Sequence, residues 1–463
     1  MRICSAGLRD QSGSAGRSSR VQKDSSWILS GSLRGLSGHS MAEGAATRRI
    51  LFLRRIEPSV GVRVGSGHAD EKGCRMIPES IGDAGAVARP DEVVPRLERL
   101  LQKVSSYSKV RHIVLGAAAI DASWEWSGAS GDANPDGTPM APDTPWFLAS
   151  VTKLYIASVV LSLHEQGLID LDAPIPGYLP DELKMGLHVR DGIDRTAQIT
   201  ATHLLAHATG LPDSLVEHRK GERGLVTEIE AGDVAFTFEE AVERIRSLTP
   251  HFPPSDLTRD RPKVRYADTN YQLLMVIAEQ ASGQSMGELH RRLLFEPLGL
   301  RHTWFPGDQP LDEVGLPATS WLGDWPLQDR PMALRSLGDL FSTTGDVLSF
   351  GRALFSGRVF ADQATGRLMH RRFNRFGFPR SVASIASPAW PIEYALGMMR
   401  FAPSRAMAMG RRLPPLLGHT GSTASWLWYS PPLGLLLAGT ADQATKAALP
   451  FRAIPSALHG LHR

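Results

Sequence analysis

The sequence predicts an α+β protein, with one antiparallel β-sheet flanked by helices and a largely helical insertion domain. Two observations predict this fold. Strand-like segments occur near residues 112–127 and again after residue 394, towards the two ends of the part expected to be ordered. Between them, residues 170–340 alternate helix-like stretches with long loops. We therefore expect a sheet domain from residues 89–169 and 341–463, and a mainly helical domain from 170–340.

The elements follow from hydrophobic periodicity. Helical spacing of apolar residues predicts amphipathic or buried helices, whereas short apolar or alternating runs predict strands. The expected helices are Asp91–Val104, Ser150–Gly167, Thr202–Ala208, Tyr271–Ala281 and, weakened by two prolines, Lys446–Leu461. The expected strands are His112–Asp121, Ser123–Ser127, Tyr394–Phe401, Ser425–Tyr429 and Leu433–Thr440.

Residues 1–88 are rich in Ser, Gly and Arg, and we expect a disordered or non-native extension. Residues 1–75 hold 13 basic against 6 acidic residues, a charge of +7. Since the whole chain carries +3, the remainder carries −4, which gives no electrostatic argument for nucleic-acid binding. Cys4 and Cys74 both lie in the extension, so the rest of the chain cannot form an internal disulfide.

The chain has no apolar stretch that approaches the roughly 20 residues of a transmembrane helix. Its start also lacks the apolar core of a signal peptide. We therefore expect no membrane span and a cytoplasmic location. An unusual export route or a misassigned start codon remains an alternative.

The first chemical motif is Ser150-Val151-Thr152-Lys153. Residues i and i+3 of a helix share a face, so Lys153 can point at the Ser150 hydroxyl. Serine is a weak nucleophile until a base takes its proton, and a desolvated lysine of depressed pKa can serve. The spacing alone is weak, because Ser106 and Lys109 repeat it where we expect only a solvated turn. A helix cap with a snorkelling lysine is the alternative.

The second motif is Tyr266-Ala267-Asp268, just before a predicted helix. A tyrosine beside a lysine ammonium loses its proton more easily and can act as a general base. Asp268 can hold Lys153 by charge and hydrogen bond. Alternatively, or in addition, Asp268 caps a helix that begins near Asn270.

The third motif is Gly418-His419-Thr420-Gly421-Ser422. Glycines allow a substrate backbone to approach, and His419 and Thr420 offer side chains to a carboxylate or carbonyl. The backbone N–H of Ser422 can join that of Ser150 in an oxyanion hole. A glycine-containing entry to a strand is the alternative.

In this order, the three motifs resemble the serine β-lactamase and penicillin-binding protein family. The resemblance is to its class C-like branch, with D-alanyl-D-alanine carboxypeptidases and related esterases, and it runs from about residue 95 to the C-terminus. It implies a β-lactamase/transpeptidase-like fold and an acyl-enzyme at Ser150, with Lys153 and Tyr266 moving the proton. It also implies that Asp268, His419, Thr420, Gly421 and Ser422 line the substrate and oxyanion site.

Two departures from the family pattern bear on the substrate. The third motif commonly begins with lysine, where this chain has His419, and the second often ends in Asn, where it has Asp268. A histidine is mostly neutral at pH 7, so it attracts a substrate carboxylate less than an ammonium does, although it could do so when protonated at lower pH. We therefore expect a hydrolase of small acyl esters or amides. A D-alanyl-D-alanine carboxypeptidase, a weak β-lactamase, an acyltransferase and a non-catalytic sensor or scaffold are the alternatives.

Two further patterns are expected to be structural. Residues 283–287 spell the G-x-S-x-G elbow of α/β-hydrolases, but a helix rather than a strand precedes them, so we expect Ser285 to cap a helix. His203 and His207 have the i, i+4 spacing of zinc ligands, without the glutamate of H-E-x-x-H. We therefore expect no metal and no cofactor, and only a small-molecule acyl substrate as partner.

Overall fold

The computed structural model describes residues 87–377, 391–403, 405, 408, 410 and 413–461. The extension predicted over residues 1–88 lies outside this part, except for its last two residues.

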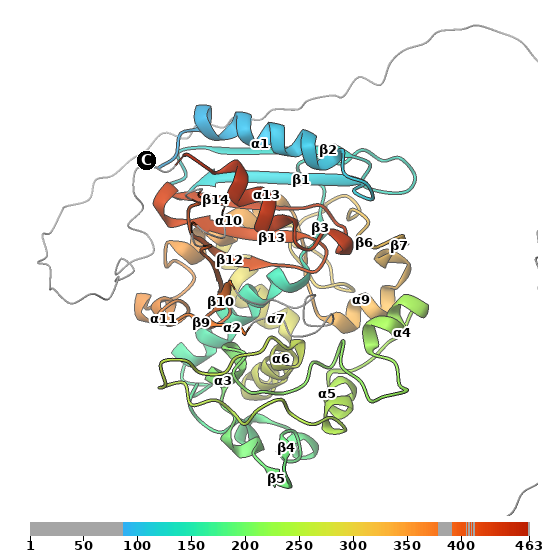
Figure 1. Ribbon diagram of the computed structural model, residues 1–463, viewed down its shortest axis with the longest axis vertical. Coiled ribbons are helices and arrows are strands. Elements are labelled where there is room, and N and C mark those ends of the chain that lie inside the picture. Colours follow the sequence, from blue (N-terminus) through green and yellow to red (C-terminus); the bar gives the residue numbers. More distant parts are fainter. Residues whose placement is uncertain are drawn as a thin grey trace, which may run out of the picture. The chain divides into compact units, whose positions relative to one another are not determined.

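The described residues form one antiparallel sheet of eight strands in the order β2-β1-β14-β13-β12-β11-β10-β9 (Figure 1). The first strand pairs with the last, with Val114 opposite Thr440, so the sheet joins the two ends of the described chain. The antiparallel sheet flanked by helices is the predicted fold class. The strands are β1 (His112–Ala119), β2 (Glu125–Gly131), β9 (Asn374–Arg375), β10 (Ile392–Tyr394), β11 (Met399–Phe401), β12 (Leu416–Thr420), β13 (Ser425–Ser430) and β14 (Leu435–Thr440).

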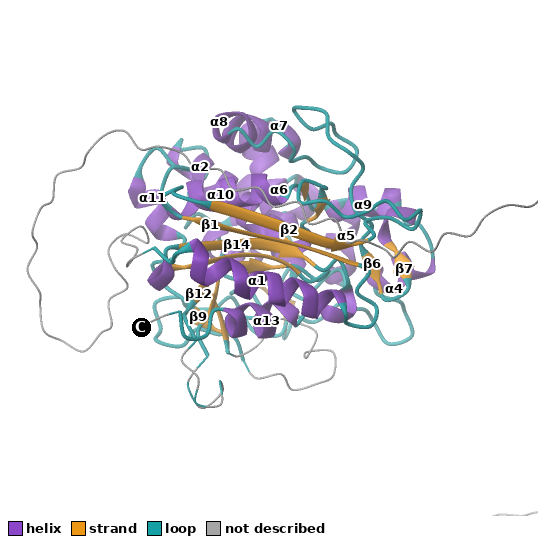
Figure 2. Cartoon of the chain, turned by 90° about the horizontal axis from the view of Figure 1, so that it is seen from above, coloured by secondary structure: helices purple, strands orange, loops and turns teal. Residues whose placement is uncertain are grey.

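Helices cover both faces of the sheet: α1 (Pro90–Ser105) and α13 (Leu449–Ala457) on one side, and α10 (Thr344–Phe355) with α2 (Thr152–Glu165) on the other (Figure 2). Alternate residues of β1 therefore enter different cores. Ile113 and Leu115 pack with α1 and α13, whereas Val114 and Ala118 pack with α2 and α10. Burial on both faces explains why this strand reads as a continuous apolar run rather than an alternation.

The helices are shorter or longer than predicted by a few residues, as is usual at helix ends. The expected helix Ser150–Gly167 is a 3₁₀ turn, η1 (Ala149–Val151), followed by α2. The α-helices are α1 (Pro90–Ser105), α2 (Thr152–Glu165), α3 (Ala201–Leu205), α4 (Leu225–Ala231), α5 (Phe238–Arg246), α6 (Asp268–Ser282), α7 (Met286–His290), α8 (Glu296–Leu298), α9 (Pro331–Leu337), α10 (Thr344–Phe355), α11 (Gln363–Leu368) and α13 (Leu449–Ala457).

Short two-stranded pieces also occur, and they were not predicted. β3 (Trp146–Phe147) pairs with β8 (Phe341–Ser342) beside the 3₁₀ turn. Two small hairpins lie within residues 170–340, formed by β4 (Val189–Arg190) with β5 (Ile193–Asp194) and by β6 (Trp321–Leu322) with β7 (Trp325–Pro326). Strands of two residues are too short to produce a recognisable hydrophobic periodicity in the sequence.

The prediction of one strand over Tyr394–Phe401 is wrong, because this segment is a hairpin of β10 and β11. Gly397 lies in the turn with φ +84°, where a Cβ would stand 2.3 Å from the Cβ of Ala157. Glycine is needed there both for the left-handed backbone and for the close approach to α2.

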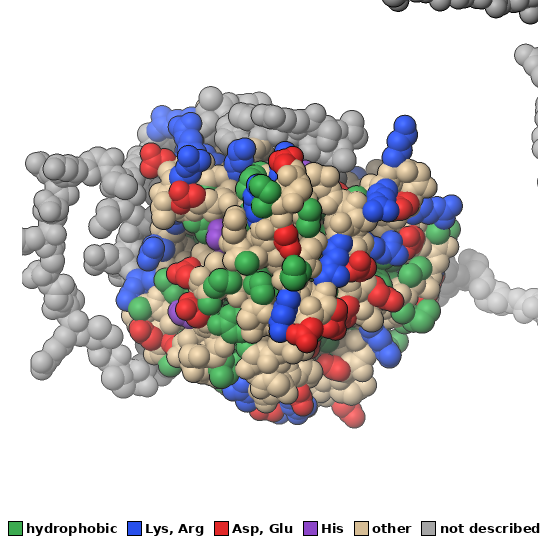
Figure 3. Space-filling view, turned by 90° about the horizontal axis from the view of Figure 1, so that it is seen from below, with side chains coloured by type: hydrophobic (Ala, Val, Ile, Leu, Met, Phe, Trp, Pro, Cys, Tyr) green, Lys and Arg blue, Asp and Glu red, His purple; other side chains and the backbone are tan. Residues whose placement is uncertain are grey.

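On the face shown in Figure 3, acidic and basic side chains are interspersed. This face therefore carries no continuous basic surface of the kind that binds nucleic acid. None of the described helices is long and apolar enough to cross a bilayer.

Candidate active site

Ser150 lies in η1, at the entrance to α2, and its side chain is partly exposed. Ala149 before it has φ +47°, a left-handed conformation that costs free energy in a residue with a Cβ. Neighbouring backbone fixes this turn, since Leu148 N–H donates to Leu340 O at 2.8 Å and Ser425 Oγ donates to Leu148 O at 2.7 Å. The serine is therefore held on a constrained turn between α2 and the sheet.

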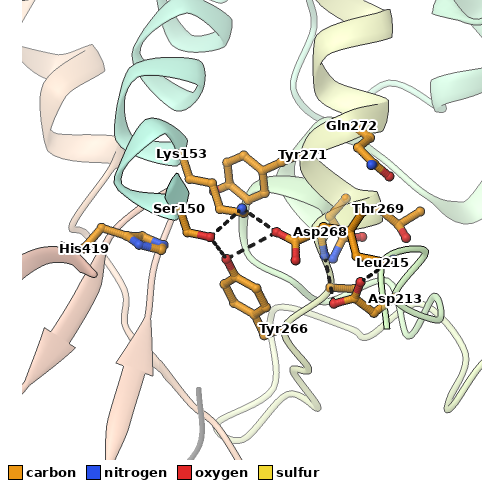
Figure 4. Close-up of polar contacts among 12 residues, drawn as sticks. Ser150, Lys153, Asp213, Leu215, Tyr266, Asp268, Thr269, Tyr271, Gln272 and His419 are labelled. Atoms are coloured by element: carbon orange, nitrogen blue, oxygen red, sulfur yellow. Dashed lines mark hydrogen bonds and ion pairs between the residues drawn. The ribbon is translucent and has the colours of Figure 1, made fainter. Parts of the chain in front are cut away.

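Two side chains contact the Ser150 hydroxyl, and Asp268 contacts both of them (Figure 4). Lys153 Nζ lies 3.1 Å and Tyr266 Oη 2.9 Å from Ser150 Oγ. Asp268 Oδ1 accepts from Lys153 Nζ at 2.5 Å and lies 3.5 Å from Tyr266 Oη. We call Ser150, Lys153, Tyr266 and Asp268 the serine cluster. It joins the first two sequence motifs, which are 115 residues apart from Lys153 to Asp268.

The charge state expected for Lys153 is wrong. Burial by itself would lower the pKa of this ammonium, but the negative charges of Asp268 and Asp339 and the hydrogen bond to Asp268 outweigh burial and raise the pKa well above its usual value. Lys153 is therefore charged in the free protein. The contact of Lys153 with Asp268 was expected and is present, but its effect on the pKa was not allowed for, and Asp339 was not expected at all.

The pKa of Tyr266 is likewise raised rather than lowered. Burial is the largest cause, and the Asp268 carboxylate adds to it, while Lys153 and the hydrogen bond to Ser150 oppose it. The phenol is therefore neutral in the free protein. Asp268 favours the protonated form of both Lys153 and Tyr266.

Asp268 does not cap α6 as the alternative interpretation proposed. The helix begins at Asp268 itself, and its N-cap is Ala267, which has no side-chain acceptor. The Asp268 carboxylate instead contacts Lys153 on α2.

His419 is fully buried on β12, to one side of the serine cluster (Figure 4). Its Nδ1 lies 2.8 Å from Thr420 O, and its Nε2 lies 3.1 Å from Tyr394 Oη. A carbonyl only accepts, so Nδ1 donates and Nε2 accepts. Burial, followed by the charge of Lys153, lowers the pKa of His419 to about 3. The ring therefore stays neutral at mildly acidic pH as well as at pH 7, and the alternative in which protonated His419 binds a carboxylate is confined to more acidic conditions.

The other residues of the third motif differ from His419 in their exposure and contacts. Thr420 is buried and Ser422 exposed, and Gly421 N–H donates to Ser425 O at 2.9 Å. A Cβ at Gly421 would lie 2.7 Å from Leu148 O and 2.8 Å from Ala149 Cβ. Glycine thus lets the end of β12 lie against the serine turn.

Reasoning from the sequence missed His207, which it treated only as a structural or metal-binding histidine. The His207 ring lies 4.4 Å from the Tyr266 ring, and its Nδ1 accepts from Asn270 Nδ2 at 2.9 Å. Its φ of +54° is unusual for a residue with a Cβ. Its i, i+4 spacing with His203 was the one local signal in the sequence, and that spacing does not indicate a contact with Tyr266.

Two carboxylates beside the serine cluster were also missed. Asp213 is buried and accepts from Asp268 N–H at 3.2 Å. Asp339 lies on the segment between α9 and β8, and burial raises its pKa to about 6 although Lys153 opposes that rise. Neither residue belongs to a motif, and only the fold brings them to the cluster.

The residues that were expected from the sequence to be structural rather than catalytic have partners outside the serine cluster. Ser106 Oγ donates to Lys103 O, and Lys109 pairs with exposed Asp324. Ser285 caps α7 in a capping box with Glu288, as predicted. Among the described residues, no group of His, Cys, Asp and Glu is arranged to hold a metal ion.

The family is identified by comparison with known proteins. The Beta-lactamase family model matches residues 112–458, which is most of the chain, and the chain belongs to this family. Esterase EstB of Burkholderia gladioli is 30% identical over 181 residues, 38% of this chain and 42% of that protein. Penicillin-binding protein 4 of Amycolatopsis lactamdurans is 27% identical over 234 residues, 49% of this chain and 55% of that protein. The matches span about half the length of these relatives.

Solved structures share the fold. The D-amino acid amidase from Ochrobactrum anthropi SV3 superimposes with a TM-score of 0.61 at 21% identity, over 79% of this chain and 98% of that one. EstCE1, a hydrolase with promiscuous acyltransferase activity, gives 0.59 at 20% identity, over 82% of this chain and 100% of that one. At these identities the likeness concerns the fold.

Proposed function

We propose that the protein is a serine hydrolase of small acyl esters or amides that works through an acyl-enzyme at Ser150. One observation carries this proposal: Ser150 Oγ lies within hydrogen-bonding distance of both Lys153 Nζ and Tyr266 Oη. A nucleophile held against acid–base groups is the arrangement that covalent catalysis needs. Membership of the Beta-lactamase family supports the same chemistry.

In the proposed reaction, Ser150 Oγ forms a bond to the acyl carbonyl carbon while its proton passes to Tyr266 Oη. The tyrosine must therefore lose its own proton before the attack. The Lys153 ammonium favours this loss and Asp268 opposes it. Collapse of the tetrahedral intermediate breaks the bond to the alcohol or amine, which takes the proton as it leaves. Water then attacks the carbonyl carbon of the acyl-enzyme ester and gives a proton to Tyr266 Oη. The bond from the acyl carbon to Ser150 Oγ breaks, Oγ takes that proton back, and the acid is released.

The developing oxyanion needs N–H donors close to Ser150. We propose the backbone N–H groups of Ser150 and Ser422 for this role. The approach of Gly421 to Leu148 and Ala149 supports it, because this contact brings the segment after β12 beside the serine turn. Preorganised donors at this position stabilise charge only as it forms.

The charges around Ser150 favour acyl donors without a carboxylate. Lys153 is paired with Asp268, and the His419 ring is neutral. Asp213 and Asp339 add negative charge near the pair when they are ionised. An anionic substrate is repelled by these carboxylates and meets no free cation among the described residues of the serine cluster.

A panel of matched substrates tests this proposal. p-Nitrophenyl butyrate and p-nitrophenyl hemisuccinate are similar in length and differ in charge, and a D-Ala-D-Ala peptide and nitrocefin probe the alternatives. We expect the neutral ester to be hydrolysed fastest and nitrocefin poorly. Nitrocefin turnover far above that of any small ester would contradict the substrate assignment. Release of one equivalent of product per protein molecule, with no further turnover of any substrate, would identify a sensor instead.

A further inference from the structure

The N-terminus of α6 is capped by a distant loop rather than by its own N-cap residue. The first N–H groups of a helix have no partner within the helix, and Ala267 offers only a methyl group. The acceptors come from the loop over residues 207–214. His207 Nδ1 accepts from Ala267 N–H at 3.3 Å, and Asp213 Oδ2 accepts from Asp268 N–H at 3.2 Å.

Neutral hydrogen bonds join the same loop to the first turns of α6. Ser214 N–H donates to Thr269 Oγ1 at 2.8 Å, and Thr269 Oγ1 donates to Pro212 O at 2.8 Å. Ser214 Oγ donates to Gln272 Oε1 at 2.6 Å. The loop therefore fixes where α6 begins, and Asp268 is its first residue. Figure 4 shows this loop on the side of Asp268 away from Ser150.

Asp213 differs from the rest of this cap because it brings a carboxyl group. It is 4% exposed, and its Oδ1 also accepts from Leu215 N–H at 3.0 Å. A serine or asparagine would cap the helix without the desolvation cost of a buried acid. Burial and the neighbouring Asp268 charge raise the pKa of Asp213 to about 7.

The charged groups around Asp213 are few among the described residues. Asp268 on α6 faces it, and Lys153 on α2 lies beyond Asp268. On its own loop, Glu217 accepts from Asp213 N–H, and Glu217 is itself paired with Arg265 at 2.7 Å and His251 at 2.9 Å. Because Glu217 already has Arg265 and His251 as partners, the group that responds most directly to the Asp213 charge is Asp268.

We propose that Asp213 is a positioning residue of the serine cluster. It holds Asp268 against Lys153, and its negative charge acts electrostatically on Asp268, Lys153 and Tyr266. This inference rests on the proposed function. Asp213 does not touch the reacting serine, and it acts through the first residue of α6.

The test compares Asp213→Asn with Asp213→Glu on the neutral ester. Asp213→Asn removes the negative charge and one hydrogen-bond acceptor. The ascending limb of the pH profile of kcat/KM reports the pKa of the base, and it should move by about half a pH unit to lower pH. Its plateau should fall roughly five-fold through kcat, from the lost bond to Asp268. Asp213→Glu keeps the charge but displaces it, so kcat should fall while the limb stays in place.

Asp346→Asn is the matched control, because Asp346 is another buried carboxylate that accepts a backbone N–H, that of His302 at 2.8 Å. Its pH profile should remain that of the wild type. An unchanged profile in Asp213→Asn, or an equal shift in Asp346→Asn, would overturn the inference. If Asp213→Asn does not fold, Asp213→Glu alone decides, and a shift of its ascending pH limb would overturn the inference. Labelling of wild-type Ser150 by a fluorophosphonate tests the proposed function separately.

Discussion

Two buried acid–base contacts in this molecule have different surroundings. On the sheet, His112 Nε2 lies 3.0 Å from Asp442 Oδ2, and both side chains are completely buried. In the serine cluster, Lys153 Nζ lies 2.5 Å from Asp268 Oδ1, and the Asp268 side chain is 21% exposed. Both contacts join residues far apart in the sequence.

The difference lies in what surrounds each contact. His112 Nδ1 contacts Asp132 O, and Asp442 Oδ1 accepts from Ser320 Oγ, so the remaining polar atoms of the sheet pair are satisfied by the protein. Lys153 also contacts the hydroxyl of a partly exposed serine. A closed network stabilises the fold, whereas one that ends on an accessible nucleophile can perform chemistry.

The largest effect is expected from Ser150→Ala. It removes the nucleophile, so turnover of the neutral ester should fall by about 10⁴-fold or more, with the melting temperature retained. Ser106→Ala and Ser285→Ala are matched controls outside the cluster and should leave kcat unchanged. Activity that survives in Ser150→Ala and is lost in Ser285→Ala would reverse the assignment of the nucleophile.

The next effect concerns the groups that move the proton. Lys153→Ala and Tyr266→Phe should each lower kcat by about 10³-fold, and the double variant should be little worse, because groups that act as a unit are not additive. A double-mutant cycle on steady-state kinetics measures this. Strictly additive losses would mean that Lys153 and Tyr266 do not share one proton.

A smaller effect, on stability rather than rate, is expected for the sheet pair. His112→Ala leaves Asp442 buried without its partner and should lower the free energy of unfolding by about 3 kcal/mol. Urea denaturation measures this loss, and kcat per folded molecule should be unchanged. A large loss of kcat in the folded variant would show that the sheet pair is not merely structural.

Asp268→Asn should mainly shift the pH dependence. The Asp268 charge raises the pKa of both Tyr266 and Lys153, so its removal lowers both values. The base is active when deprotonated, and its limb in the kcat/KM profile should therefore move by about one unit to lower pH. A limb that stays in place or moves to higher pH would show that Asp268 does not set the charge of the cluster.

The sequence was sufficient for the fold class and for the likeness to the family. Hydrophobic periodicity located β1, β13 and β14 to within two residues, because these strands are long and buried. It merged β10 with β11, because a turn of few residues interrupts the apolar pattern too briefly. The domain boundaries over 89–169, 170–340 and 341–463 stay a prediction.

For the site, local spacing indicated which residues could meet, but not their charge states. A depressed pKa was expected for Lys153 because its helix is apolar, and the expected contact with Asp268 raises that pKa instead. His419 was expected to offer its side chain, but Tyr394 and the backbone occupy its nitrogens. In both cases the degree of burial and the strength of the tertiary contacts decided the charge of the side chain, and neither has a local signature.

The most direct test of the central claim is to map where a covalent probe attaches. The protein is incubated with a fluorophosphonate, digested, and analysed by peptide mass spectrometry, with Ser150→Ala treated in parallel. The account predicts one equivalent of label on the peptide that contains Ser150, and none on the variant. Label on the peptide that contains Ser285, or ester hydrolysis that persists with Ser150 unlabelled, would contradict it.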